Sequence, residues 1–348
     1  MTETMTTSGS RTSDSRALLS VRDLRVSFKG LRGDEFTAVD GVSFDVEPGQ
    51  TVGLVGESGC GKSVTSLAIM GLLPKRGNTV TGQALFEGTD LLSLSDRELR
   101  DRRGQDIAMI FQDPLSSLNP VVPIGVQVTE VMERHRGLSR KEAMPEAEHL
   151  LNRVGIPDPR ARLKNYPHQL SGGMRQRALI AMALACAPRL LIADEPTTAL
   201  DVTIQAQILA LLKELVIDTG TALVMITHDL GVVAGLCDQV NVLYAGRIVE
   251  RGDRHDLFRE PRHPYTGGLL ASIPRLDAPR GESLHPIPGS VSDNLPWTSA
   301  CAFAPRCSSA TEICREQTPQ WDGDDRTGFQ CFNPLSGATE ANVKEGAR

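Results

Sequence analysis

The chain has 348 residues, enough for one large domain with an extension, and 40% of them are hydrophobic while only 4% are aromatic. Its formal net charge of -6 argues against broad nucleic-acid binding, which usually needs a basic face. No apolar run approaches the roughly 18 residues of a membrane-spanning helix, so we expect any membrane association to come through partner proteins.

Alternating strand and helix patterns predict an α/β protein with one nucleotide-binding core. The patterns occupy residues 18–110 and 187–250, and a helical insert over about residues 111–186 lies between them. Residues 1–17 are rich in Ser and Thr, lack an apolar segment and do not match a secretory signal. We therefore expect a disordered leader and a cytosolic chain whose thiols stay reduced.

The first motif is a glycine-rich loop that fits G-x-x-x-x-G-K-[ST]: Gly56-Glu57-Ser58-Gly59-Cys60-Gly61-Lys62-Ser63. It follows a strand-like run, residues 51–55, and opens a helical run, which is the context that a phosphate-binding loop requires. Its glycines let the backbone close around phosphate oxygens, Lys62 would neutralise the β and γ phosphates, and the Ser63 hydroxyl would bind Mg²⁺. Cys60 and Val64 complete the candidate nucleotide-binding stretch, although Cys60 has a variable position in the motif and its thiol is not a required ligand.

The insert carries two helices and a second glycine-rich turn. We expect one helix over residues 126–136 and another that opens at Ser139, because Ser139 and Glu142 form a capping box. Two prolines in the polar segment 113–120 predict a surface loop and not a helix. The second turn precedes an apolar helical run, residues 178–185, and reads Leu170-Ser171-Gly172-Gly173-Met174-Arg175-Gln176-Arg177. Such a turn directs backbone N–H groups toward an anion. One phosphate loop is enough to hold one nucleotide, so the second turn needs a separate explanation.

Two carboxylates end the next strand-like run. Residues 189–193 are mostly apolar and continuous, which predicts a buried parallel strand, and Asp194 and Glu195 follow at its carboxyl end. Ligands of open α/β sheets bind at that edge. Asp194 is placed to hold Mg²⁺, and Glu195 is placed to polarise the attacking water.

These motifs, with three shorter ones, make the chain resemble an ABC-transporter ATP-binding subunit over about residues 21–250. The shorter motifs are Ile110-Phe111-Gln112-Asp113-Pro114, Ala199-Leu200-Asp201 and Ile226-Thr227-His228-Asp229. The resemblance implies a P-loop NTPase with a RecA-like core, an antiparallel β subdomain and the helical insert, within an ATPase domain over residues 18–260. It also implies that two subunits pack head to tail, so that Ser171, Gly172 and Gly173 close over the γ-phosphate held by the partner's loop.

The resemblance assigns further roles. Gln112 resembles the Q-loop glutamine that helps to organise Mg²⁺, Asp201 the D-loop aspartate that communicates across the dimer, and His228 the switch histidine that contacts the γ-phosphate. The family stacks an aromatic residue on adenine, and Phe28 lies at the matching place, with Phe36 as the alternative. The catalytic candidates are then Lys62, Gln112, Glu195 and His228.

The last stretch, residues 261–348, is dense in proline and cysteine. Its segments 263–266, 288–289 and 301–307 resemble the tail of oligopeptide and dipeptide importer ATPases. This resemblance implies an ATP-hydrolysing subunit at the cytoplasmic face of the cell membrane that powers peptide import. The implied partners are two permease subunits, an extracytoplasmic binding protein and a second ATPase that is a related chain. Import of nickel or another small solute, and a soluble regulatory ATPase without a permease, stay open as alternatives.

Four of the seven cysteines lie in this extension: Cys301, Cys307, Cys314 and Cys331. Four thiols in a short, poorly apolar segment usually compensate for a missing core, and metal is favoured because disulfides are rare in the cytosol. The close pairs typical of structural zinc are absent, and the spacing is not that of bacterial ferredoxins. The importer subfamily includes members with a [4Fe–4S] cluster at these cysteines, so we expect a cluster here, with zinc or unligated thiols as alternatives.

Overall fold

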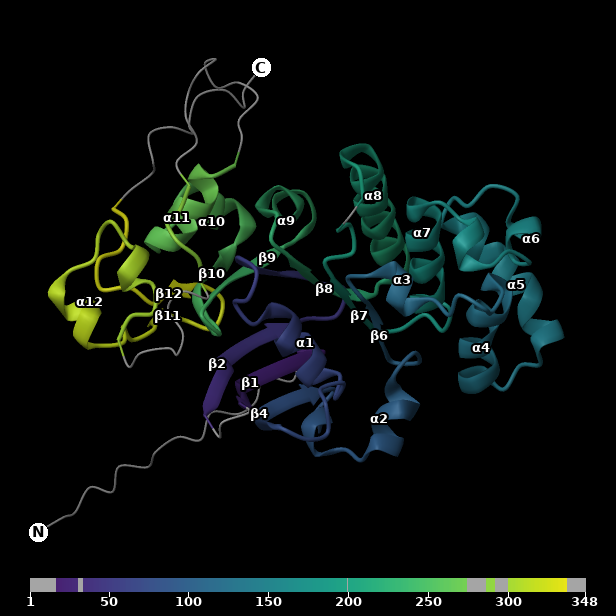
Figure 1. Cartoon of the computed structure of the whole chain (residues 1–348), viewed down its shortest axis with the longest axis horizontal. Helices are drawn as coiled ribbons and strands as arrows, with labels where there is room; N and C mark the ends of the chain where they lie inside the picture. The colour runs from purple at the N-terminus through teal and green to yellow at the C-terminus, as the bar shows by residue number, and fades with distance from the viewer. Residues whose placement is uncertain (1–16, 31–33, 199, 274–285, 292–299, 337–348) are drawn as a thin grey trace, which may run out of the picture.

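The computed structural model describes residues 17–30, 34–198, 200–273, 286–291 and 300–336. The expected leader lies outside these residues, apart from its last position. A central sheet occupies the middle of the molecule, the helical insert lies at one end, and the C-terminal extension lies at the other (Figure 1). This arrangement agrees with the predicted α/β class.

The central sheet holds eight strands within the described residues, in the order β11-β12-β10-β9-β3-β8-β7-β6. Strands β9, β3, β8, β7 and β6 run parallel, whereas β10, β12 and β11 continue the sheet in antiparallel fashion. Every residue of β3, β7 and β8 is buried, which explains why these strands are continuous apolar runs. The strands span Thr51–Val55 (β3), Ile107–Ile110 (β6), Leu190–Asp194 (β7), Ala222–Thr227 (β8), Gln239–Tyr244 (β9), Arg247–Asp253 (β10), Asp322–Gly323 (β11) and Gly328–Phe329 (β12).

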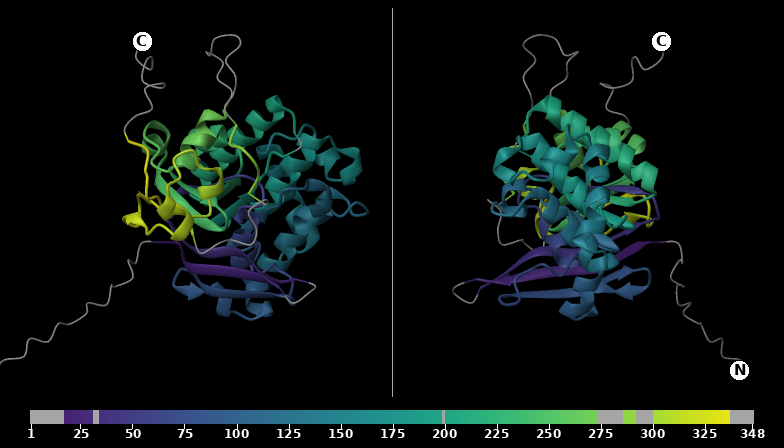
Figure 2. Two further views of the ribbon diagram at one scale, coloured as in Figure 1. Left: turned by 60° about the vertical axis from the view of Figure 1, so that its left-hand side comes forward. Right: turned by 90° about the vertical axis from the view of Figure 1, so that its right-hand side faces the viewer.

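A second, antiparallel sheet forms its own layer, seen as the purple and blue strands in Figure 2. Its order is β2-β1-β4-β5, and helix α1 packs against both this sheet and β7. Helix α1 therefore joins the two sheets directly after the phosphate loop. The elements span Leu19–Lys29 (β1), Glu35–Val46 (β2), Lys62–Ile69 (α1), Asn78–Phe86 (β4), Thr89–Asp90 (β5) and Asp96–Arg102 (α2).

The insert is helical, as expected, and the capping box predicted at its second long helix is present. The Ser139 Oγ accepts the Glu142 N–H at 3.4 Å, and a Glu142 carboxylate oxygen accepts the Ser139 N–H at 2.8 Å. Two features of the insert differ from the prediction. The helices span Pro114–Ser117 (α3), Ile124–Arg136 (α4), Arg140–Arg153 (α5), Pro159–Arg162 (α6) and Gly172–Ala183 (α7).

The prediction of a loop without helix over residues 113–120 is wrong, because α3 lies within it. Proline is well tolerated in the first helical turn, where its missing N–H has no partner to lose, and the hydroxyls of Ser116 and Ser117 donate to the Asp113 carbonyl. Helix α7 also begins six residues earlier than expected. The Ser171 Oγ accepts the Met174 N–H at 3.3 Å and caps the helix, so the predicted glycine-rich turn is its first turn.

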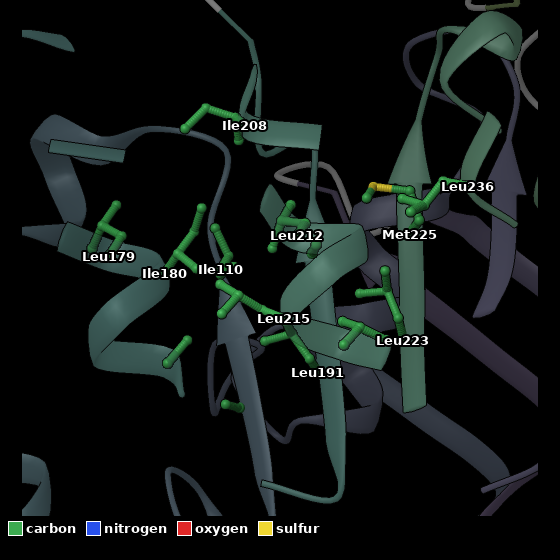
Figure 3. Packing of buried hydrophobic residues seen from close by; sticks show 14 of the residues in the cluster. Ile110, Leu179, Ile180, Leu191, Ile208, Leu212, Leu215, Leu223, Met225 and Leu236 are labelled. Atoms are coloured by element: carbon green, nitrogen blue, oxygen red, sulfur yellow. The ribbon is translucent and has the colours of Figure 1, made fainter. Parts of the chain in front are cut away.

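Helices α7, α8 (Val202–Thr219) and α9 (Leu230–Leu236) cover strands β6, β7 and β8 with aliphatic side chains (Figure 3). Burial of each such side chain contributes about 1.5–3 kcal/mol, so this layer is a principal source of stability. With aromatic residues at only 4%, most of the core is aliphatic. The labelled members are Ile110, Leu179, Ile180, Leu191, Ile208, Leu212, Leu215, Leu223, Met225 and Leu236.

The extension is built onto the central sheet. Strand β12 pairs with β10, and the Glu250 carboxylate accepts the backbone N–H groups of Arg262 and His263 at 2.7 and 2.9 Å. Among the residues described, no helix has the length and apolar character needed to cross a bilayer. The remaining helices are α10 (Arg254–Arg259), α11 (Pro264–Ala271) and α12 (Glu312–Glu316).

A buried histidine in this joint makes stability depend on pH. His263 is 1% exposed, its Nδ1 accepts the Tyr265 N–H at 3.0 Å, and burial lowers its pKa to about 3. An unfolded histidine titrates near pH 6.5, so below that pH the unfolded chain binds a proton that the folded chain excludes. The free energy of unfolding therefore falls as the pH drops from about 6.5 toward about 3.

We expect H263N, which keeps a capping oxygen at the start of α11, to lose less stability on acidification than the wild type. Between pH 6.5 and 5.5 the difference should approach but not exceed about 1.4 kcal/mol per pH unit. Urea unfolding at each pH measures it, with H149N at an exposed position as the matched control. Identical pH profiles for H263N and wild type would contradict this account.

Candidate nucleotide site

A cavity of about 850 Å³ lies where strands β3, β6, β7 and β8 end. Its volume is within the range of small-molecule sites. The carboxyl ends of parallel strands meet at this edge, which is where ligands bind in α/β sheets. The cavity brings together most of the predicted residues: Phe28, Glu57, Ser58, Gly59, Gly61, Lys62, Ser63, Val64, Gln112, Glu195 and His228.

The phosphate loop wraps around the ammonium group of Lys62. The Lys62 Nζ donates to the carbonyl oxygens of Gly56 at 2.7 Å and Glu57 at 2.9 Å, and the side chain is 5% exposed. Gly61, which precedes α1, has a φ of 99°, and a Cβ there would approach the Ala38 carbonyl oxygen to 2.5 Å. Only glycine fits this turn. The loop therefore holds a positive charge and a helix N-terminus at the cavity, as an anion site requires.

Cys60 belongs to the loop but points away from its cavity. The side chain is fully buried, and its sulfur lies 3.7 Å from Lys62 Nζ. Burial raises the pKa of the Cys60 thiol. Its role in the loop is that of a small buried side chain, which agrees with a position that is not a ligand.

Ser63 and Asp194 form a pair of oxygen ligands. The Ser63 Oγ donates to Asp194 Oδ1 at 3.0 Å, and Asp194 is 5% exposed. Burial raises the pKa of Asp194, the Ser63 hydrogen bond lowers it, and the nearby Glu195 raises it again. A hydroxyl beside a carboxylate is the donor set that Mg²⁺ takes in phosphate-loop sites, so these two residues fit the ion.

The Glu195 carboxylate is held by three neighbours. Its Oε2 accepts from Gln112 Nε2 at 3.0 Å and from Thr198 Oγ1 at 2.9 Å, and its Oε1 lies 3.2 Å from His228 Nδ1. Gln112, Glu195 and His228 come from three different strand ends, so the predicted catalytic candidates meet as the motifs indicated. Thr198 was missed, because a threonine three residues after a carboxylate carries no signal of its own.

Glu195 also has an unusual backbone. Its φ is 46°, in the left-handed region that non-glycine residues rarely adopt, and its N–H donates to the Ile226 carbonyl at 2.9 Å. Such a conformation costs about 1–3 kcal/mol and persists where the surroundings over-determine it, typically at functional sites. The turn aims the carboxylate into the cavity instead of along the strand.

The second glycine-rich segment lies away from this cavity. Ser171 caps α7, Asp201 caps α8 by accepting the Ile204 N–H at 3.0 Å, and both side chains are exposed. A Cβ on Gly173 would lie 2.9 Å from a methyl of Ile204, so the two helix starts are in contact. Gly172, between them, faces Leu200. The structure therefore places a pair of helix N-termini, those of α7 and α8, outside the chain's own phosphate site.

Both candidate adenine-stacking residues line the cavity. Phe28 on β1 lies directly opposite Phe36 on β2 in the antiparallel pair, so both side chains are available at the same place. Three lining residues from the C-terminal extension were not expected at all, because nothing in their local sequence indicates a nucleotide: Leu269, Ser290 and Val291.

The predicted [4Fe–4S] cluster is wrong. In the described part of the chain, which includes all four cysteines of the extension, no group of three or more His, Cys, Asp or Glu residues is placed to hold a metal ion. The cysteines line one cavity, but it measures about 10 Å³, which is room for about one water molecule. The four cysteines concerned are Cys301, Cys307, Cys314 and Cys331.

Three of these thiols are buried enough for their pKa to shift. Burial raises the pKa of Cys301 and of Cys307, and it raises that of Cys331 to about 11. The Cys314 sulfur already contacts Thr311 Oγ1 at 3.4 Å and Asn333 Nδ2 at 3.5 Å. The four are free thiols packed together under the extension.

Comparison with known proteins agrees with this site. A family model described as ABC transporter matches residues 39–198, and one described as oligopeptide/dipeptide transporter, C-terminal region, matches residues 249–314. The oligopeptide transport ATP-binding protein OppD of Escherichia coli is 51% identical over 319 residues, which cover 92% of this chain and 94% of OppD. The dipeptide transport ATP-binding protein DppD of Bacillus subtilis is 55% identical over 303 residues, 87% of this chain and 90% of DppD.

Solved structures show the same fold. The dimeric structure of MJ0796, a bacterial ABC transporter cassette, has a TM-score of 0.59 and 29% identity, and covers 68% of this chain and 98% of its own. A post-hydrolysis state of the same cassette, bound to ADP and phosphate, has a TM-score of 0.58 and 26% identity. ABC ATPases work with ATP and Mg²⁺, and the site holds residues for both. The chain therefore belongs to the ABC-transporter ATPases, in the branch of oligopeptide and dipeptide transport ATP-binding proteins.

Proposed function

We propose that this chain binds MgATP at a site shared with a second ATPase subunit and hydrolyses it to power peptide import through membrane permease subunits. The observation that carries the proposal is the division of the motifs. Lys62, Gln112, Glu195 and His228 share one cavity, whereas Ser171 is exposed and lies outside it with Gly172 and Gly173. One chain thus carries a nucleotide site that is open on one side. Elsewhere it carries the segment that would close the same site on another chain.

Within the site, each residue has a distinct task. Lys62 and the loop amides bind the β and γ phosphates, while Ser63 and Asp194, with Gln112, hold Mg²⁺. The ion supplies positive charge where negative charge develops on the phosphoryl oxygens. The adenine ring stacks on Phe28 or on Phe36 opposite it.

Hydrolysis rests on the Glu195 group. Its carboxylate accepts a hydrogen bond from the attacking water, which orients the water, and then takes its proton. Gln112 and Thr198 hold that carboxylate in place. His228 pairs with Glu195 through Nδ1, and its side chain, 61% exposed, would contact the γ-phosphate. Positioning and charge stabilisation account for most of phosphoryl-transfer catalysis, and this arrangement provides both.

In a head-to-tail dimer, the partner supplies the segment that closes each site. Ser171, Gly172 and Gly173 would direct the N-terminus of α7 at the partner's γ-phosphate, and Asp201 would connect the two sites. The dimeric state of the related cassette supports this arrangement. ATP then favours the closed dimer because it binds that state best, and hydrolysis removes the preference. Closure in turn moves the permease.

The partners follow from the relatives, which are named as oligopeptide and dipeptide transport ATP-binding proteins. We expect two permease subunits, an extracytoplasmic substrate-binding protein and a related second ATPase, with this chain peripheral on the cytoplasmic face. Apolar side chains that face solvent around α3 suit the permease contact: Phe111 is 38%, Val121 77% and Tyr166 37% exposed. Co-purification of this chain with membrane subunits, and peptide uptake that depends on it, test the assembly.

Replacing Glu195 by Gln should stop ATP hydrolysis without preventing ATP binding. The amide keeps the shape, and its oxygen can still accept from Gln112 and Thr198, but it cannot accept a proton, so we expect the rate of phosphate release to fall by roughly 10²–10⁴-fold. Affinity for a fluorescent ATP analogue should stay near the wild-type value. E214Q, an exposed change on α8, is the control, and wild-type hydrolysis by E195Q would show that another residue is the base.

Replacing Ser171 by Asp separates the two ATP sites of the assembled transporter. Aspartate also caps a helix, so α7 should stay folded, but its charge would repel the partner's γ-phosphate. We expect a photoreactive ADP, formed from the ATP analogue and trapped by vanadate, to label the partner's phosphate loop less and this chain's own loop as before. K62A should give the reverse pattern. Loss of label from this chain's own loop in S171D would contradict the head-to-tail arrangement.

A further inference from the structure

We propose that Arg306, in the C-terminal extension, is a positioning residue for the phosphate loop: it neutralises and orients Glu57 and thereby sets the affinity of this site for ATP. The inference rests on the proposed role of Lys62 and its loop. It gives the extension a task in nucleotide binding, 249 positions along the chain from the loop that it serves.

The Arg306 guanidinium is almost enclosed and fully engaged. Its side chain is 4% exposed, and it forms a two-pronged ion pair with Glu57, Nη1 to Oε2 at 2.6 Å and Nη2 to Oε1 at 2.9 Å. Its Nε donates to the Pro288 carbonyl at 2.7 Å, and Nη2 also donates to the Gly289 carbonyl at 3.1 Å. Bidentate pairs of this kind are strong and fix geometry, so the carboxylate has one orientation.

Glu57 transmits this order to Lys62. Its carboxylate is bound by Arg306, its backbone N–H donates to Tyr265 Oη at 2.9 Å, and its carbonyl oxygen accepts from Lys62 Nζ at 2.9 Å. Two of the three polar groups of Glu57 are therefore held by the extension, and the third holds the phosphate-binding lysine. A shift of Glu57 would move the carbonyl on which the ammonium depends.

The extension itself is anchored to the core, so it can serve as a rigid support. The rings of Tyr244 on β9, Tyr265 on α11 and Phe303 lie 4.7 to 5.3 Å apart in pairwise edge or tilted contacts. The Arg306 guanidinium lies 5.7 Å from the centre of the Tyr244 ring. Val291, 2% exposed, lines the nucleotide cavity from the same side.

Charge gives the pair its second effect. Glu57 lines the cavity and its side chain is 30% exposed, so a bare carboxylate there would face the phosphates of ATP. Arg306 neutralises that charge. Because Arg306 is buried and does not line the cavity, it does not bind the nucleotide itself. An ion pair that only stabilised the fold would have no reason to influence phosphate affinity or its dependence on salt.

The test measures binding of MgATP to the purified full-length chain for R306M, E57Q and the double variant. We expect R306M to weaken binding at least tenfold, because it leaves Glu57 charged and unheld. The double variant should return to within about threefold of the wild type, since it removes the repelling charge as well. The weakening in R306M should shrink as salt rises, because salt screens charge at the cavity mouth.

Two further variants keep the outcome decisive. R306K keeps the charge but cannot form the two-pronged contact, so it should fold and bind ATP several-fold more weakly than the wild type. R315M, an exposed change in the same extension, is the matched control and should bind normally. The proposal is overturned if R306M and R306K both bind ATP as the wild type does, or if E57Q does not restore binding to R306M.

K62A distinguishes failure of this inference from failure of the proposed site. If K62A fails to bind ATP while R306M binds it normally, the phosphate loop is assigned correctly and Arg306 has only a structural role. If K62A itself binds ATP normally, the proposed nucleotide site is wrong and the role of Arg306 fails with it. Thermal unfolding without nucleotide, recorded for each variant, shows whether a change in affinity follows a change in fold.

Discussion

The parallel register of the central sheet is the constraint on which the site depends. Strand β3 pairs with β8 so that Val55 lies opposite Thr227, and β7 pairs with β8 so that Asp194 lies opposite Ile226. Residues that follow these strands therefore meet at one edge. A slip of one residue would move a carboxylate about 3.3 Å and turn it to the other face of the sheet. The aliphatic packing around β7 and β8 thus fixes the distances at which the chemistry operates.

At this edge the fold gathers carboxylates around a site for an anion, and it does so by giving each acid its own partner. Glu57 is bound by Arg306, Asp194 by Ser63, and Glu195 by a group that includes Gln112. In the part of the chain that the structure describes, the hydrogen bonds of Lys62 go to carbonyl oxygens and a sulfur, and none goes to a carboxylate. Its positive charge is therefore left for the phosphates.

The sequence was sufficient for features that depend on local pattern. The strand before the phosphate loop, the capping box at Ser139 and the meeting of Glu195 with His228 all follow from short motifs and from the rule that parallel strands share an edge. It was insufficient where distant segments decide. The left-handed φ of Glu195 and the contact of Arg306 with the loop depend on packing between distant elements. No local sequence pattern predicts such packing. The number of cysteines in the extension and the resemblance to cluster-bearing relatives led to the wrong expectation of a metal cluster, because thiols can pack as buried side chains as readily as they bind metal.

The two segments that would form the proposed composite site are supported by different parts of the molecule, and this has a consequence for coupling. The phosphate loop is held from behind by the extension through Glu57, whereas the start of α7 is held by α8 through Gly173 and Ile204. The helical insert, which carries α7, lies at the opposite end of the molecule from the extension (Figure 1). A movement of the insert can therefore bring Ser171 toward or away from a partner's nucleotide without disturbing the ion pair that holds this chain's own loop. In the proposed dimer, such a division would let one subunit keep its ATP bound while its other face responds to the membrane partner.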